Sequence, residues 1–308
     1  MTTADKSARY CADLVAGIAD AGVDVVFISP GSRNTPLTLA FATEPRIHDL
    51  AIRDERSAGF AALGYGKATG RPAAVVCTSG SAGTHYFPAV VEADQAGVPM
   101  IVLTADRPAR LRGTGAPQTM NQIDLYGQHV KTFIDLDVGG AAGRSDGHGL
   151  VESAVTLPPG AVHANAAFEE ELLPDTPISS PGVGDWVAPE PAVAASSDRL
   201  DGLVGRKVLI VAGGRQGPGF SDAVSEVATS LCAPVMSDPQ CWVTGHNAVA
   251  NGDLLAGSTH ALDMSPPDVV LRLGPIPTSK PLWTWLERSG VEQILVDRSR
   301  LTDPLGGA

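Results

Sequence analysis

Two arginines follow short apolar segments of the chain, at places where a ligand could reach them. Arg33 stands in SPGSRN (29–34), directly after an apolar run, and Arg107 follows a second such run. A guanidinium group presents a fork of N–H donors that matches a carboxylate. Two arginines at strand ends therefore indicate a small substrate with several negative charges. The alternative is a polar turn whose arginine pairs with a nearby acid.

An acidic residue and a small-residue loop stand at two further turns. Glu55 lies in RDERSAGF (53–60), where a strand gives way to a helix. Its carboxylate could serve a ligand, or it could only favour the helix dipole. Ser79 and Gly80 lie in TSGSAGT (78–84), which leads into another helix and could cradle an anion or a ring. These small residues could equally serve only to let a helix and a strand pack closely.

The segments that must position these residues alternate between helical and short apolar patterns. The expected helices cover 8–21, 56–68, 81–96, 219–231 and 281–289, and the expected strands cover 23–28, 73–79, 99–105, 207–214, 234–238, 268–274 and 292–297. Continuous apolar strands separated by helices are typical of parallel sheets buried on both faces. In such sheets ligands bind beyond the carboxyl ends of the strands. Glycines in the stretch 138–160 argue against a stable helix there.

The fold class that follows is α/β, with two three-layer domains and mainly parallel sheets. We expect the first domain at 1–175 and the second at 199–308. The segment 176–198 is rich in proline and shows little periodicity, so it is expected to be a linker.

Composition excludes several classes of function. The formal charge is −12, which opposes binding to nucleic acid. No run of 18 apolar residues is present, and the N-terminus lacks the apolar segment of a secretory signal. The 4 cysteines have no CxxC spacing, so free thiols are expected. These features predict a cytoplasmic protein with no membrane insertion.

Longer strings carry a specific resemblance. FISPGSRNTPL, RDERSAGFAALGYG, CTSGSAG and the pair LTADRP and GTGAPQTMNQ resemble the pyrimidine-binding domain of the menaquinone-pathway 2-succinyl-5-enolpyruvyl-6-hydroxy-3-cyclohexene-1-carboxylate synthases. The resemblance extends into the second domain through PDVVLRLGPIPTSKPLWTWL, which is similar to the central domain of these enzymes. It implies a transferase of menaquinone biosynthesis that uses thiamine diphosphate, 2-oxoglutarate and isochorismate.

The resemblance also implies a role for individual residues. Glu55 matches the glutamate that hydrogen-bonds to N1′ of the cofactor's aminopyrimidine and so activates the cofactor, which supplies the carbanion chemistry. The positions that match contacts to the cofactor are Glu55, Pro30, Gly31, Ser79, Gly80 and Gln118. Those that match contacts to the substrates are Ser32, Arg33, Arg107, Gln118 and Lys280.

One part of the family's site has no counterpart in the sequence. These enzymes hold diphosphate and Mg²⁺ (or Mn²⁺) with a Gly-Asp-Gly segment and a downstream asparagine in a C-terminal domain, and no such pair is present, so no metal ligand is assigned. We expect that this domain is absent from the chain and that the metal and diphosphate ligands come from elsewhere, such as a separate chain. The chain is then a truncated or split portion of the enzyme. The family also implies a homo-oligomer, either a dimer or a tetramer.

Two alternatives stay open. The chain could be a degenerate, non-catalytic relative that only binds carboxylates. It could also be another thiamine-diphosphate enzyme of the acetolactate synthase type, whose chemistry gives the two strand-end arginines no dicarboxylate to bind.

Overall fold

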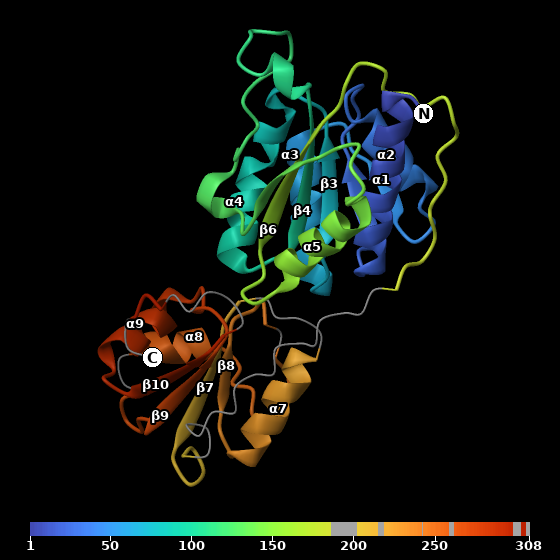
Figure 1. Cartoon of the computed structure of the whole chain (residues 1–308). Helices are drawn as coiled ribbons and strands as arrows, with labels where there is room; N and C mark the ends of the chain where they lie inside the picture. The colour runs from blue at the N-terminus through green and yellow to red at the C-terminus, as the bar shows by residue number, and fades with distance from the viewer. Residues whose placement is uncertain (186–201, 215–218, 242, 259–261, 298–302, 306–308) are drawn as a thin grey trace. The chain divides into compact units, whose positions relative to one another are not determined.

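The chain forms two compact units, Met1–Pro191 and Ala192–Ala308, in a computed structural model (Figure 1). The structure describes residues 1–185, 202–214, 219–241, 243–258, 262–297 and 303–305. The expected linker residues 186–198 lie outside these ranges.

The first unit is built around a six-stranded sheet whose paired strands are all parallel. Its elements are α1 (Thr3–Asp20), β1 (Val25–Ile28), α2 (Thr35–Thr43), β2 (His48–Ala51), α3 (Glu55–Thr69), β3 (Ala73–Cys77), the 3₁₀ helix η1 (Ser81–Tyr86), α4 (Phe87–Ala96), β4 (Met100–Asp106), the short 3₁₀ helices η2 (Ala109–Leu111) and η3 (Gly127–His129), β5 (Phe133–Leu136), α5 (Gly143–Val155) and β6 (Ala161–Ala167). The strand order is β2-β1-β3-β4-β6-β5. The predicted α/β class with parallel strands is therefore confirmed.

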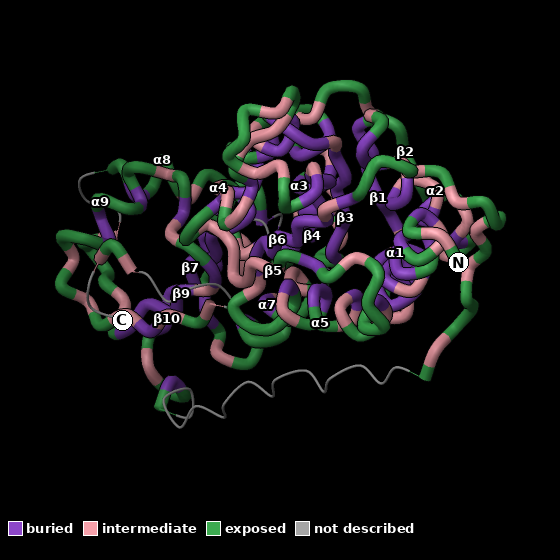
Figure 2. Tube along the Cα trace, turned by 45° about the horizontal axis from the view of Figure 1, so that its top comes forward, coloured by how far each residue is buried: buried purple, intermediate pink, exposed green. Residues whose placement is uncertain are grey.

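Helices cover both faces of this sheet. Successive strand residues point to opposite faces, so Val26 and Val76 pack with α1, α2 and α5, whereas Val25 and Val75 pack with α3 and α4. Figure 2 shows β1, β3, β4 and β6 as buried tubes within this unit. Their burial on both faces explains why these strands read as unbroken apolar runs.

Helix α5 forms where the sequence analysis argued against a helix, so that expectation was wrong. Two of its glycines, Gly143 and Gly147, lie against α1, and α1 and α5 are adjacent in Figure 1. A Cβ added at Gly147 would lie 2.3 Å from the carbonyl oxygen of Leu14. The glycines therefore allow the two helix backbones to approach closely, and the packing offsets their poor helix propensity.

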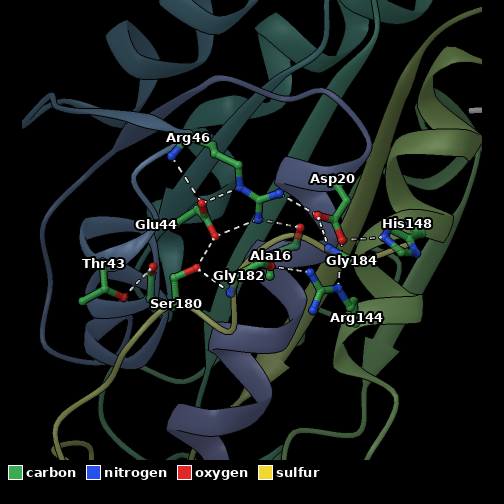
Figure 3. A network of polar contacts seen from close by, with 11 residues as sticks. Ala16, Asp20, Thr43, Glu44, Arg46, Arg144, His148, Ser180, Gly182 and Gly184 are labelled. Carbon is green, nitrogen blue, oxygen red and sulfur yellow. Dashed lines mark hydrogen bonds and ion pairs between the residues drawn. The ribbon is translucent and has the colours of Figure 1, made fainter. Parts of the chain in front are cut away.

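A network of ion pairs and hydrogen bonds around the buried carboxylates of Asp20 and Glu44 holds the segment after β6 against the rest of the first unit (Figure 3). The carboxylate of Asp20 is 1% exposed and accepts hydrogen bonds from Arg46, Arg144 and the backbone N–H of Gly184. Burial raises the pKa of Asp20, but these hydrogen bonds outweigh that effect and hold it below its ordinary value. Ser180 donates to Glu44 in the same network. The first residues of the expected linker thus pack on this unit.

The second unit contains a smaller parallel sheet of four strands. Its elements are β7 (Val208–Ala212), α7 (Phe220–Ser230), β8 (Val235–Ser237), α8 (Gly252–Gly257), β9 (Val269–Leu273), α9 (Lys280–Arg288) and β10 (Glu292–Val296), in the strand order β10-β9-β7-β8. Ile210 of β7 packs with α7, and its neighbour Leu209 packs with α8 and α9. This unit is therefore a second three-layer α/β arrangement.

Candidate functional site

The carboxyl-terminal edge of the six-stranded sheet gathers most of the residues that the sequence singled out. Because the strands are parallel, the segments that follow β1, β3, β4 and β6 all leave the sheet at this edge. Arg33 follows β1, Gly80 follows β3 and Arg107 follows β4. Glu55, the first residue of α3, follows β2.

The two arginines converge on one carboxylate oxygen. Nη2 of Arg33 lies 3.1 Å from Oε1 of Glu170, and Nη1 of Arg107 lies 3.8 Å from the same oxygen. Arg33 is buried, and its Nη1 donates to the backbone carbonyls of Phe168 and Glu169, both at 3.0 Å. The two arginines thus contact the carboxylate of Glu170, which realises the alternative of an arginine paired with a nearby acid.

Glu55 is half-buried beside two fully buried side chains. Burial raises the pKa of the Cys77 thiol, and the negative charge of Glu55 raises it further. Burial also raises the pKa of the Tyr86 phenol, to which Glu55 adds a smaller part. Tyr86 donates a hydrogen bond to the carbonyl of Val76 at the end of β3. The Glu55 carboxylate has no hydrogen-bond partner among the residues that the structure describes.

The loop at Gly80 is fixed by a buried glutamine. Oε1 of Gln122 accepts a hydrogen bond of 2.8 Å from the Gly80 N–H, and its Nε2 donates to the carbonyl of Ala105 and to Oδ1 of Asn165. Gly80 has φ 84° and ψ −146°, a backbone conformation that residues with a Cβ rarely adopt. Asn165 in turn donates to Asp106, the residue before Arg107. One network thus connects the β3 loop with the β4 loop.

Buried polar atoms without a partner gather at the same edge. In the described part of the chain, side-chain nitrogen or oxygen atoms of this kind belong to Arg33, Asn34, Thr78 and Arg107 at this edge, and to His163 and Arg272 elsewhere. A buried polar group without a hydrogen bond is costly, and most find a partner. Four such groups in three adjacent loops are the pattern expected of a site that takes a polar ligand.

The other predicted residues lie in loops of the first unit or in the second unit. Pro30, Ser32 and Gln118 are exposed in the loops of the first unit, and Gln118 donates to the carbonyl of Ser79. Gly31 lies against Thr78, where an added Cβ would be 2.4 Å from the threonine Cβ, so the β1 and β3 loops pack together. Lys280 is exposed at the first position of α9, in the second unit. Its role stays a prediction.

Two residues that the sequence analysis did not single out belong to this site. Gln122 lies four positions after Gln118, in the string that carried the resemblance, but nothing in a sequence shows that a glutamine is buried. Glu170 stands in a run of three acidic residues, where one side chain cannot be told from its neighbours. Its pairing with Arg33, 137 positions away, exists only in the folded chain.

Neither a metal centre nor a membrane span can be assigned from the described residues. They contain no group of three or more histidine, cysteine, aspartate or glutamate side chains that could hold a metal ion. None of the described helices combines the length and the apolar character needed to cross a bilayer.

Comparisons with known proteins identify relatives of the chain. Residues 9–125 match the family described as "Thiamine pyrophosphate enzyme, N-terminal TPP binding domain". The chain is similar to the 2-succinyl-5-enolpyruvyl-6-hydroxy-3-cyclohexene-1-carboxylate synthase of Geobacillus kaustophilus (41% identity over 98% of this chain and 56% of the relative). It is also similar to the synthases of Listeria innocua (37%, covering 94% and 53%) and Haloarcula marismortui (36%, covering 100% and 57%). The chain spans little more than half the length of the curated relatives it matches.

Proposed function

We propose that the chain carries the pyrimidine-binding and carboxylate-binding part of an active site. The reason is that it belongs to the family of 2-succinyl-5-enolpyruvyl-6-hydroxy-3-cyclohexene-1-carboxylate synthases and spans about half their length. The proposed reaction adds the carbanion of decarboxylated 2-oxoglutarate to isochorismate, in menaquinone biosynthesis. The observation that carries the proposal is the convergence of Arg33 and Arg107 on one carboxylate position, on the sheet edge that also bears Glu55.

Thiamine diphosphate would supply the nucleophilic carbon when it is bound. The role of this chain would be to orient the cofactor and to hold one proton on it. The Glu55 carboxylate, which lacks a partner among the described residues, would accept a hydrogen bond from N1′ of the aminopyrimidine and so hold a proton on that nitrogen. Gly80 would contact the cofactor through its backbone, because it has no Cβ and because Gln122 holds the loop in place. The unpartnered Thr78 hydroxyl fits the same role.

The arginines would bind the carboxylates of the two substrates. Each substrate is a dianion, and a pair of guanidinium groups in a partly buried site binds such a charge more strongly than exposed lysines would. Ser32 and Gln118 are exposed in neighbouring loops and would add hydrogen bonds to the same substrates. Lys280 is proposed as a further carboxylate ligand from the second unit.

The remaining parts of the enzyme are proposed from the family resemblance. We expect Mg²⁺ (or Mn²⁺) and the diphosphate to be held by residues other than those of this sequence, and the working enzyme to be a homo-oligomer in the cytoplasm. The competing proposal is a relative that only binds carboxylates, which the arginine pair alone would also support. The two proposals differ in whether Glu55 acts on the cofactor.

The experiment that tests the proposal measures exchange of the thiazolium C2 proton of thiamine diphosphate by NMR. The chain is combined with Mg²⁺ and with a diphosphate-binding domain supplied from one of its relatives. We expect exchange to be accelerated in this mixture, and Glu55→Gln to reduce that acceleration by about 100-fold or more, the usual contribution of a positioned acid or base. Glu152→Gln, an exposed change in α5, is the matched control and should leave the rate unchanged. Unaltered exchange in Glu55→Gln would remove the cofactor assignment and favour the carboxylate-binding relative.

A further inference from the structure

Glu170 occupies the centre of the arginine site. Its Oε1 lies 3.1 Å from Nη2 of Arg33 and 3.8 Å from Nη1 of Arg107. A carboxylate oxygen between two guanidinium groups is the contact that an anionic substrate would make there. Within the described residues, this is also the one ion pair in which Arg107 takes part.

The carboxylate is the movable member of this group. The Glu170 side chain is 71% exposed, whereas Arg33 is 4% and Arg107 is 22% exposed. Arg33 is fixed by two backbone carbonyls through Nη1, and the backbone N–H of Arg107 donates to Asp106. If Glu170 swings into solvent, the Arg33 guanidinium therefore stays in place, with the donors of its Nη2 free for another carboxylate.

Both arginines have unused hydrogen-bond donors while Glu170 is in place. The Nε atoms of Arg33 and Arg107 are buried and have no hydrogen-bond partner among the described residues. Arg107 makes an ion pair with Glu170 at 3.8 Å, which is too long for a hydrogen bond. The site thus has more donors than Glu170 uses, as expected of a site completed by a larger anion.

The balance of charge decides what this larger anion is. Two guanidinium groups and one carboxylate leave a formal charge of +1, which suits a monoanion, whereas the arginines alone present +2 and suit a dianion. The neighbouring Glu169 does not change this balance, since its carboxylate pairs with Arg110. The position of Glu170 therefore determines the charge of the ligand that the site accepts.

We propose that the Glu170 carboxylate holds the place of a substrate carboxylate between Arg33 and Arg107, so that a dicarboxylate binds by displacing it. Glu170 then sets both the affinity of the site and its preference among anions. The inference rests on the proposed function of these arginines in carboxylate binding. It is independent of Glu55 and of the cofactor.

The test is calorimetric binding of succinate, a dicarboxylate, and of butyrate, a monocarboxylate, to the purified chain without cofactor. Glu170→Gln removes the competing charge and keeps the shape, and the exposed position carries little risk to folding. We expect it to lower the Kd for succinate by about threefold to tenfold, the range for losing a partly screened charge contact. The gain for butyrate should be smaller, because it has one negative charge.

Glu169→Gln is the matched control, since it makes the same change of charge one residue away and loosens only the contact with Arg110. Its succinate affinity should stay within about twofold of that of the wild type, which excludes an effect of net charge alone. Equal or weaker succinate binding in Glu170→Gln would overturn the proposal, because Glu170 would then be a structural support of the arginines. Absence of succinate binding to both proteins would overturn it too. Neither result touches the proton-exchange test of Glu55, so failure of the inference and failure of the proposed function are distinguishable.

Discussion

Gln122 is the residue whose removal tests most directly how the Gly80 loop is held. Its side chain is fully buried, accepts from the Gly80 N–H and donates to the Ala105 carbonyl and to Asn165. In Gln122→Ala the Gly80 N–H loses its partner inside the protein, at a cost of about 1–3 kcal/mol. The truncation also leaves a cavity, so we expect a total loss of roughly 2–5 kcal/mol in the free energy of unfolding.

The measurement is urea unfolding of the chain, followed by ¹⁹F NMR after incorporation of fluorotyrosine. The tyrosines report on the first unit because all of them lie in it: Tyr10, Tyr65, Tyr86 and Tyr126. Gln128→Ala is the matched control, because Gln128 is exposed and its loss should change stability by less than about 0.5 kcal/mol. Equal stability of the two variants would refute the conclusion that Gln122 fixes the loop.

Two further predictions concern the packing and the buried histidine of the first unit. Gly147→Ala should destabilise the chain by about 1–3 kcal/mol, because the new Cβ would lie 2.3 Å from the Leu14 carbonyl, whereas Gly149→Ala in the same helix meets nothing within 4 Å and should be neutral or slightly stabilising. Urea midpoints decide this, and equal effects would contradict the close packing of α1 and α5. Burial lowers the pKa of His163 from 6.5 to about 3, so the unfolded chain binds more protons in this range. The free energy of unfolding should therefore fall between pH 6.5 and about 3, by at most about 1.4 kcal/mol per pH unit. His163→Asn should reduce this slope, and an unchanged slope would exclude the histidine as its source.

Some parts of the fold could be predicted because they depend on local composition. The strands β1, β3, β4, β7 and β9 consist mainly of apolar residues, many of them β-branched, and their burial on both faces makes them readable without a structure. Besides α5, no range was predicted for four further α-helices and strands of the first unit, although a strand was expected before Glu55. They are α2, β2, β5 and β6; β2 (HDLA) and β5 (FIDL) each contain an aspartate, so neither strand is an unbroken apolar run.

Helix α5 shows the limit of propensity as a guide. Its glycines weaken an isolated helix, and that property was read correctly from the sequence. The stabilising contribution comes from α1, more than a hundred residues earlier, which packs against the surface that those glycines leave open. The packing of α5 on α1 outweighs the low helix propensity of the glycines, and no local sequence pattern indicates that packing.

The sequence by itself determined the α/β class and the placement of Arg33, Glu55, Gly80 and Arg107 in the turns or helix starts that follow strands. These are properties of short stretches, and parallel strands then place such turns at one edge. Only the tertiary structure decided that both arginines meet at one oxygen of Glu170 and that Gln122 holds the Gly80 loop. The reason is physical: a charge pair or a buried hydrogen bond joins residues through space, and the sequence separation between them carries no record of that distance.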